Sequence, residues 1–256
     1  GWGKAVPQKV LSNKELARKV DTDDEWIVAR TGISQRFIAS GNETTATLAT
    51  GAAREALDIA DIAPDDIDLI IVATCTPEHN FPSTASLVQD ALGARNAGAF
   101  DMGAACTGFV YALSVAAQAI QSGAMDTVLV IGAETLSKIV NWEDRGTCVL
   151  FGDGAGACVL RSSENPGGVL ASVLRSDGSG GDLLKVPAGG SAMPTSYETV
   201  RDKLNTIHMN GREVFRFATR VMADACRDVV ASAGLTMDDI KIIVPHQANK
   251  RIIEAA

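Results

Sequence analysis

Cys106 and His246 are the two residues whose type and surroundings best suit covalent chemistry. Cys106 lies in FDMGAACTGF, between a strand-like run and an apolar helix-like segment, with glycine and alanine on both sides. Small residues permit a sharp strand-to-helix turn and close approach of a substrate. The free N–H groups at a helix N-terminus favour a thiolate, so we expect a lowered pKa for Cys106. The spacing indicates a nucleophile. The alternative is a cysteine that merely packs at the start of a helix.

A cysteine that carries an acyl group needs a partner that can hydrogen-bond a developing oxyanion or move a proton. His246 follows the apolar run IIV within PHQAN, which places His246 and Asn249 just past the carboxyl end of a predicted strand. Ligands bind at that edge of α/β sheets. The alternative for His246 is a histidine that caps the next helix. We expect surface or loop positions for His79 and His208.

The other four cysteines fit structural positions. Cys75 ends an apolar strand, Cys148 and Cys158 lie in apolar runs, and Cys226 falls on the apolar face of a helix. The five cysteines are odd in number and contain no CxxC pair, so we expect reduced thiols. The three histidines lack the spacing of a metal site, and we predict no metal.

Composition limits the classes of function. The chain has 256 residues, 46% of them hydrophobic and 21% charged, which allows a substantial core. The formal net charge of -8 argues against nucleic-acid binding. No apolar run approaches the roughly 20 residues that span a bilayer, and no leader pattern opens the chain, so we expect a cytoplasmic protein without membrane contact. Because the chain starts at Gly1 and stops within the helix-like RIIEAA, we also expect it to be cut at both ends.

Hydrophobic periodicity predicts alternating helices and strands, and therefore an α/β fold. Helices are predicted after the capping box at Ser12 and over residues 44–60, 83–92 and 107–122, and strands over 67–74, 97–102 and 127–133. TCVLF and GACVLRS predict two more strands, joined by a tight turn at GDGAG. GDGAG is not a phosphate loop, because no GKS or GKT follows it. Residues 165–196 are rich in glycine and serine and predict a hairpin and an exposed loop.

An internal repeat occurs at an offset of 173 residues, where DDIDLIIV (65–72) aligns with DDIKIIVP (238–245). The helices before them also align, as REALDIADI with RDVVASAGL. Duplication is the favoured explanation, and a pattern shared by unrelated α/β units is the alternative. We therefore predict an N-terminal half over residues 1–162 and an incomplete C-terminal half over 163–256.

Four motifs occur in one order over essentially the whole chain: DEWIVARTGI, GAFDMGAACTGF, DRGTCVLFGDGAGA and VPHQANKRII. Together they resemble the β-ketoacyl-acyl-carrier-protein synthase III family, the initiating condensing enzymes of type II fatty acid synthesis. The resemblance implies a thiolase-like αβαβα five-layered sandwich made of duplicated halves, in a homodimer. It implies that Cys106 takes a short acyl group from coenzyme A, which is a substrate and not a cofactor. Malonyl-acyl-carrier protein then loses carbon dioxide and attacks the thioester to give a β-ketoacyl product.

The resemblance also assigns roles to individual residues. His246 would stabilise the decarboxylating malonyl thioester with an asparagine expected beyond Ala256, for which Asn249 is no substitute. Trp26 and Arg145 would enclose the adenine of coenzyme A, which suits an indole and a planar guanidinium. The alternatives are a core tryptophan and an arginine paired with Asp144 or Glu143. The other predicted contacts to coenzyme A or the acyl tunnel are Phe81, Phe215 and Asn249.

Arg212, Arg216 and Arg220 recur every four residues along one predicted helix, whose apolar face carries Val214, Phe217 and Val221. With Arg30, Lys250 and Arg251 they predict a basic surface that docks an acidic carrier protein. A solvated face on which Arg220 pairs with Asp224 is the alternative. Initiating polyketide or quinolone synthases share these motifs, and a noncatalytic fragment of the enzyme is a further alternative.

Overall fold

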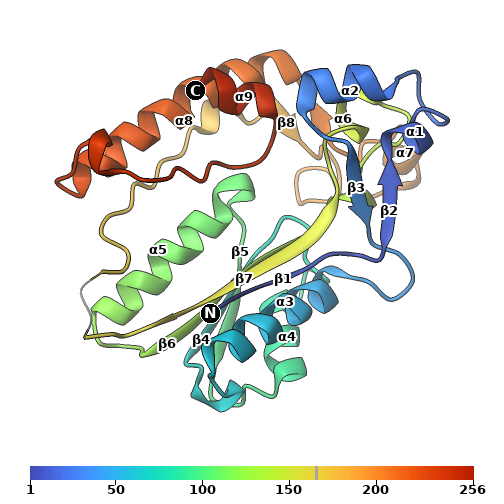
Figure 1. Ribbon diagram of the computed structural model, residues 1–256. Helices are drawn as coiled ribbons and strands as arrows, with labels where there is room; N and C mark the ends of the chain where they lie inside the picture. The colour runs from blue at the N-terminus through green and yellow to red at the C-terminus, as the bar shows by residue number, and fades with distance from the viewer. Residues whose placement is uncertain (165–166) are drawn as a thin grey trace. The chain divides into compact units, whose positions relative to one another are not determined.

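The computed structural model describes every residue except 165 and 166 (Figure 1). Its contacts divide the chain into two compact units, each built from three segments. Unit 1 comprises Gly1–Val10, Phe37–Leu136 and Gly152–Val169. Unit 2 comprises Leu11–Arg36, Ser137–Phe151 and Leu170–Ala256.

Unit 1 contains a five-stranded sheet in the order β1-β7-β6-β4-β5. Its strands are β1 (Trp2–Ala5), β4 (Leu69–Ala73), β5 (Gly98–Met102), β6 (Thr127–Thr135) and β7 (Asp153–Arg161). β4 runs parallel to β5 and β6, whereas β7 is antiparallel to β1 and β6. Ala73 lies opposite both Met102 and Gly132, so β4, β5 and β6 reach the same edge of the sheet with their carboxyl ends.

Helices cover both faces of this sheet (Figure 1). They are α3 (Thr45–Ala60), α4 (Thr84–Leu92) and α5 (Gly108–Gln121). The first two begin at capping hydroxyls, because Thr44 accepts from the amide of Thr47 and Ser83 accepts from that of Ser86. Strands 67–74, 97–102 and 127–133 and the three helices were all predicted from periodicity, and the structure confirms them to within a few residues.

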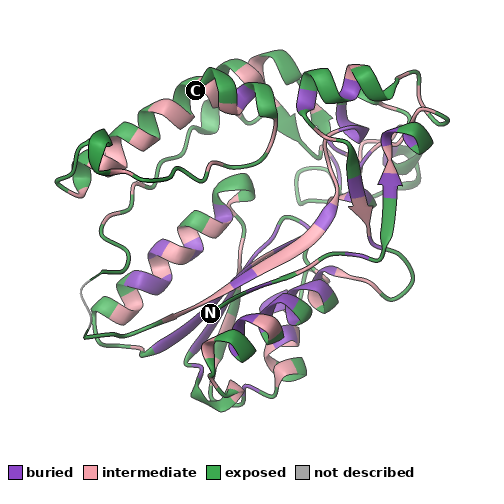
Figure 2. Ribbon diagram, in the orientation of Figure 1, coloured by how far each residue is buried: buried purple, intermediate pink, exposed green. Residues whose placement is uncertain are grey.

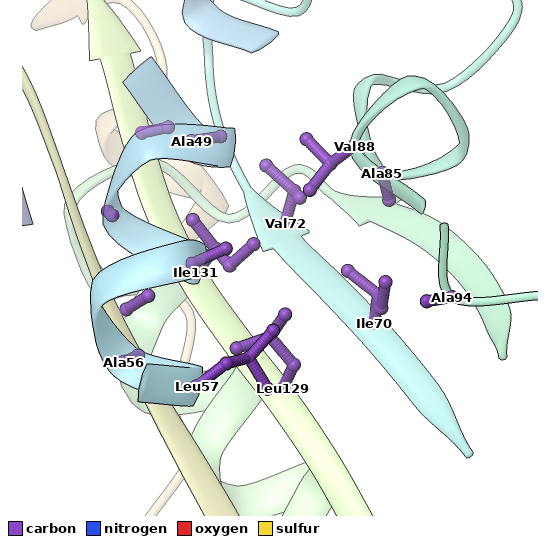
Figure 3. Packing of buried hydrophobic residues seen from close by; sticks show 14 of the residues in the cluster. Ala49, Ala56, Leu57, Ile70, Val72, Ala85, Val88, Ala94, Leu129 and Ile131 are labelled. Carbon is purple, nitrogen blue, oxygen red and sulfur yellow. The ribbon is translucent and has the colours of Figure 1, made fainter. Parts of the chain in front are cut away.

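The core of unit 1 comes from these apolar faces. Figure 3 shows Ile70 and Val72 of β4 packed with Leu129 and Ile131 of β6 against α3 and α4. All four side chains are fully buried. Burial of each contributes roughly 1.5–3 kcal/mol relative to an exposed position. On the opposite face, a second cluster joins the same strands to α5, which holds the sheet edge and the start of α5 in place.

Unit 2 consists of short elements and one long helix. They are α1 (Asn13–Leu16), α2 (Asp24–Thr31), α6 (Arg145–Cys148), α7 (Tyr197–Arg201), α8 (Gly211–Ser232), α9 (Lys250–Ala255), β8 (Leu184–Lys185) and β9 (His208–Met209). β8 pairs with β9, and β2 (Lys9–Ser12) pairs with β3 (Gln35–Ile38). Buried Arg36 fastens this unit internally, since its guanidinium donates to the Asn13 side chain at 2.8 Å and to the Val149 carbonyl at 3.1 Å.

The prediction of two strands joined by a turn at GDGAG is confirmed in part: GACVLRS lies in β7 up to Arg161, but TCVLF forms no strand and GDGAG forms no turn between strands. Residues 145–148 are helical because Asp144 accepts from the Gly146 amide and the Thr147 hydroxyl, both at 2.8 Å. GDGAG itself enters β7, where Gly154 and Gly156 are paired with β6. These two glycines therefore lie in an antiparallel strand pair and not in a turn.

The strand predicted for IIV in the second repeat is also absent. Ile242 and Val244 are 78% and 81% exposed, and residues 241–245 pair with no strand in the part of the chain that the structure describes. At the offset of 173 residues, the 3-10 turn Pro64–Asp66 still corresponds to a second 3-10 turn, Met237–Asp239. The likeness ends where the strand would begin, because a strand forms only against a neighbour that supplies hydrogen bonds.

The loop predicted for 165–196 is largely exposed, although its first two residues lie outside the described part of the chain. α8 contains no buried residue (Figure 2). Its apolar Phe217 and Val221 are 40% and 38% exposed. None of the described helices is both long enough and apolar enough to cross a membrane.

Candidate functional site

Cys106 lies in a sharp turn at the carboxyl edge of the sheet. The 3-10 turn Ala105–Thr107 follows β5, and α5 begins directly after it at Gly108. Ala105 has a left-handed φ of 47°, a conformation that costs a non-glycine residue about 1–2 kcal/mol. A Cβ on Gly108 would lie 3.1 Å from the Cβ of Ala73, so glycine allows the helix to start close against β4. The turn leaves Cys106 exposed just before the helix.

The expected lowering of the Cys106 pKa is wrong. Desolvation by surrounding protein atoms raises the pKa of its thiol, and the negative charge of Glu134 raises it further. A hydrogen bond with the backbone of Cys106 itself lowers the pKa but does not outweigh desolvation. The free protein therefore holds Cys106 as a neutral thiol.

Cys75 is not the packed structural cysteine that was predicted. It follows β4 by two residues and is exposed. Desolvation is the largest of several effects that raise the pKa of Cys75 to about 12, and the neighbouring Glu134 carboxylate and Cys106 thiol raise it further. Its amide donates to Glu134 at 2.8 Å. Glu134 was not identified from sequence, although a carboxylate near the end of the apolar run TVLVIGAET was the available signal.

In unit 2 the structure brings Trp26 and Arg145 together. The Arg145 guanidinium lies 4.9 Å from the centre of the Trp26 ring, and that of Arg30, on the same helix as Trp26, lies 5.0 Å from it. Arg145 also donates to the Asp21 carbonyl at 2.8 Å. The alternatives for Arg145 fail, because Asp144 caps α6 and Glu143 pairs with Lys203. This stack offers an aromatic face and planar cations to a flat ligand.

His246 lies in the loop before α9 and is exposed. Desolvation lowers the pKa of its imidazole, so it is neutral at neutral pH. Asn249 and not His246 caps α9, because the Asn249 side chain accepts from the Arg251 amide at 2.8 Å. Because Asn249 is the cap residue, His246 is not needed for that role. A neutral imidazole has one nitrogen that donates a hydrogen bond and one that accepts a hydrogen bond. His246 belongs to unit 2 and Cys106 to unit 1.

The remaining predicted residues have separate settings. Phe215 on α8 lies under the Arg251 guanidinium, whose centre is 5.9 Å from its ring. Phe81 in unit 1 is 86% exposed. The predicted pairing of Arg220 with Asp224 is not observed, because Arg227 pairs with Asp224 at 3.3 Å. The basic residues predicted for the docking surface are all exposed: Arg30, Arg212, Arg216, Arg220, Lys250 and Arg251.

Comparison with known proteins identifies close relatives. The family model for 3-oxoacyl-[acyl-carrier-protein (ACP)] synthase III matches residues 100–178, which include Cys106. A β-ketoacyl-[acyl-carrier-protein] synthase III from Caldanaerobacter subterraneus subsp. tengcongensis is 56% identical over 100% of this chain and 77% of that relative. The crystal structure of 3-oxoacyl-[acyl-carrier-protein] synthase III from Aquifex aeolicus VF5 is 48% identical, with a TM-score of 0.91 over 100% of this chain and 78% of that one. The crystal structure of the priming β-ketosynthase from the R1128 polyketide biosynthetic pathway is 38% identical, with a TM-score of 0.88 over 100% of this chain and 75% of that one.

The relatives that match the whole chain, together with the family model that matches the Cys106 segment, place the chain among acyltransferases of the condensing class. Within that class, the chain belongs to the β-ketoacyl-acyl-carrier-protein synthase III family. The reaction of this family is the condensation that initiates fatty acid synthesis.

Proposed function

We propose that Cys106 is the acyl acceptor of this enzyme. Its sulfur attacks the carbonyl carbon of a short acyl-coenzyme A, the thiol proton is lost, and coenzyme A leaves as its thiol. The observation that carries this proposal is the exposed position of Cys106 in a strained turn at the carboxyl edge of β4, β5 and β6. A strained turn that presents a nucleophile is a recurrent arrangement in acyl-transfer enzymes.

The second half of the reaction consumes malonyl-acyl-carrier protein. Loss of carbon dioxide leaves a carbanion, which attacks the Cys106 thioester and displaces the thiolate, giving a β-ketoacyl-acyl-carrier protein. We assign His246 to the malonyl carbonyl oxygen, where its imidazole stabilises developing negative charge by hydrogen bonding. Its neutral state suits this role, because desolvation keeps the pKa of His246 below its ordinary value.

Trp26 and Arg145 are assigned to the adenine of coenzyme A. Because the guanidinium now stacks directly on the indole, at 4.9 Å, adenine must displace it and insert between the two planes. Arg145 is already tethered to Asp21, which limits how far it can move away. Phe81, Phe215 and Asn249 are assigned to the pantetheine and acyl path, although Asn249 also caps α9.

For the carrier protein we assign Arg30, Arg212, Arg216, Lys250 and Arg251. These five cations are exposed although the chain as a whole has a net charge of -8. Their positive charge favours an acidic partner. Two of them have acidic neighbours, since Arg216 pairs with Glu213 and Lys250 with Glu254. Arg212 and Arg251 are therefore the better sites for charge-reversal experiments.

The finer architecture is part of the same proposal. The five-layered sandwich, with one half over residues 1–162 and an incomplete one over 163–256, is supported by the matching 3-10 turns at the offset of 173. We further propose a homodimer, supported by the exposed Phe81, and a cytoplasmic location. Sedimentation of the purified protein tests the homodimer directly.

Product formation tests the proposed reaction. Acetyl-coenzyme A and malonyl-acyl-carrier protein should give β-ketobutyryl-acyl-carrier protein and carbon dioxide. Cys106→Ala should abolish the ketone product. His246→Ala should slow condensation by on the order of a hundredfold while Cys106 still becomes acetylated. Unchanged condensation in either variant would refute that residue's role.

The likeness to a priming β-ketosynthase of a polyketide pathway supports a second candidate function, in which the same condensation starts a polyketide chain. The two functions differ in the carrier protein that supplies the malonyl group. A competition between fatty acid and polyketide malonyl-carrier proteins decides between them. Preference for the polyketide carrier would replace the first candidate with the second.

A further inference from the structure

Glu134 lies at the same sheet edge as Cys106 and takes no part in the reaction described above. It follows Gly132 of β6 by two residues, as Cys75 follows Ala73 of β4, and Gly132 and Ala73 are paired. One carboxylate oxygen of Glu134 accepts from the Cys75 amide at 2.8 Å, and the other accepts from the Thr76 hydroxyl at 2.6 Å. Both oxygens therefore fasten the Cys75–Thr76 turn to β6.

A layer of buried threonines fixes this carboxylate from behind. The Thr76 hydroxyl that donates to Glu134 also accepts from the Thr135 amide at 2.8 Å. The Thr45 hydroxyl donates to the Thr76 carbonyl at 2.6 Å and hydrogen-bonds the Thr135 hydroxyl at 2.9 Å. All three threonines are buried, so neither the turn nor the carboxylate can shift without breaking buried hydrogen bonds.

The Cys75–Thr76 turn in turn contacts the segment that presents Cys106. The Cys75 thiol is hydrogen-bonded to the backbone of Ala105, the residue directly before Cys106. Two titratable groups interact with the Glu134 charge, Cys75 after β4 and Cys106 before α5. Desolvation raises the pKa of Glu134, and its hydrogen bonds to Thr76 and Cys75 oppose that rise.

We propose that Glu134 is a positioning residue for Cys106, which holds the Cys75–Thr76 turn against Ala105 and places a fixed negative charge beside the nucleophile. This inference rests on the proposed role of Cys106 as acyl acceptor. The charge disfavours a resting thiolate, so Cys106 stays protonated until an acyl donor is bound. A protonated thiol resists the alkylation and oxidation that a resting thiolate would undergo.

Alkylation of Cys106 by iodoacetamide, measured across pH by peptide mass spectrometry, tests this without any need for turnover. Glu134→Gln removes the charge and keeps the side-chain shape. We expect the midpoint of Cys106 alkylation to fall by at least about 0.5 pH unit, which makes alkylation about threefold faster below the midpoint. Asp68→Asn is the matched control, because Asp68 accepts from the amides of Asp126 and Thr127, at 2.8 and 2.9 Å, at the opposite end of the same strands.

A folded Glu134→Gln protein with the wild-type midpoint would overturn the proposal, as would an equal shift in Asp68→Asn. If Glu134→Gln does not fold, Glu134→Asp decides. It keeps the charge but is too short to reach both donors, so we expect a near wild-type midpoint and a changed plateau rate of Cys106 alkylation. An unchanged plateau rate would overturn the positioning role. Failure of acetylation in the wild type would instead refute the proposed function, since the alkylation experiment does not depend on it.

Discussion

Replacement of Arg145 by alanine tests the adenine site most quantitatively. In the free protein the Arg145 guanidinium lies 4.9 Å from the centre of the Trp26 ring, and adenine must take its place on that face. A guanidinium stacked on an aromatic ring contributes about 0.5–2 kcal/mol. Without Arg145 the bound state loses its contact with adenine, but the free state no longer has to give up the Trp26 stack.

These two changes partly cancel, so the net loss falls in the lower part of that range. We expect Arg145→Ala to weaken coenzyme A binding by about three- to tenfold, and Trp26→Ala by more, because it removes the whole platform. Because both residues would contact the same ring, the double variant should lose less than the sum of the single variants.

Isothermal titration with coenzyme A measures these affinities. Arg161→Ala, which removes an exposed arginine at the end of β7, is the control and should bind like the wild type. Wild-type affinity in both Arg145→Ala and Trp26→Ala would refute the adenine assignment. Strict additivity in the double variant would show that the two side chains do not act on a common group.

Three further predictions concern the fold and its pH dependence. Ile70→Ala should lower the free energy of unfolding by about 2–5 kcal/mol in urea, whereas Ile59→Ala, at a 54% exposed position, should change it by less than about 0.5. Gly108→Ala should lower the free energy of unfolding by about 1–3 kcal/mol and slow acetylation, because its Cβ would lie 3.1 Å from a side-chain carbon of β4. In Gly103→Ala the new Cβ would meet no atom within 4 Å, so neither the stability nor the acetylation rate should change. Folding lowers the pKa of His246 below 6.5, so as pH falls His246 becomes protonated in the unfolded state before it does so in the folded state. Wild-type stability should therefore drop relative to His246→Gln below about pH 6.5, and a constant difference in urea unfolding across that range would contradict it.

Local patterns predicted the elements around Cys106 well. The apolar strands and amphipathic helices of unit 1 are defined by neighbours a few residues apart, and the structure places them as expected. The ionisation of Cys106 was mispredicted because it depends on contacts between distant segments. Glu134 reaches Cys75 across 59 residues of sequence, and no local pattern reveals that carboxylate beside the thiol.

The errors in the second repeat and at GDGAG have the same origin. Glycine is compatible with both a turn and a close-packed strand, and only the pairing of Gly154 and Gly156 with β6 decides between them. The apolar run at 242–244 has strand-forming residues, yet a strand also needs a partner, and the described chain supplies none. The proximity of Trp26 and Arg145 was inferred from resemblance alone, because no spacing rule joins α2 to α6.

Acylation of Cys106 is the step on which the proposed reaction depends. Incubation with acetyl-coenzyme A followed by digestion and mass spectrometry reports each cysteine separately, and Cys75, exposed at the same sheet edge, serves as the internal control. We predict acetylation of the Cys106 peptide in the wild type and in Cys75→Ala, and none in Cys106→Ala. A folded wild-type protein whose acetyl group resides on Cys75, or that carries none, would contradict the role of Cys106 as acyl acceptor.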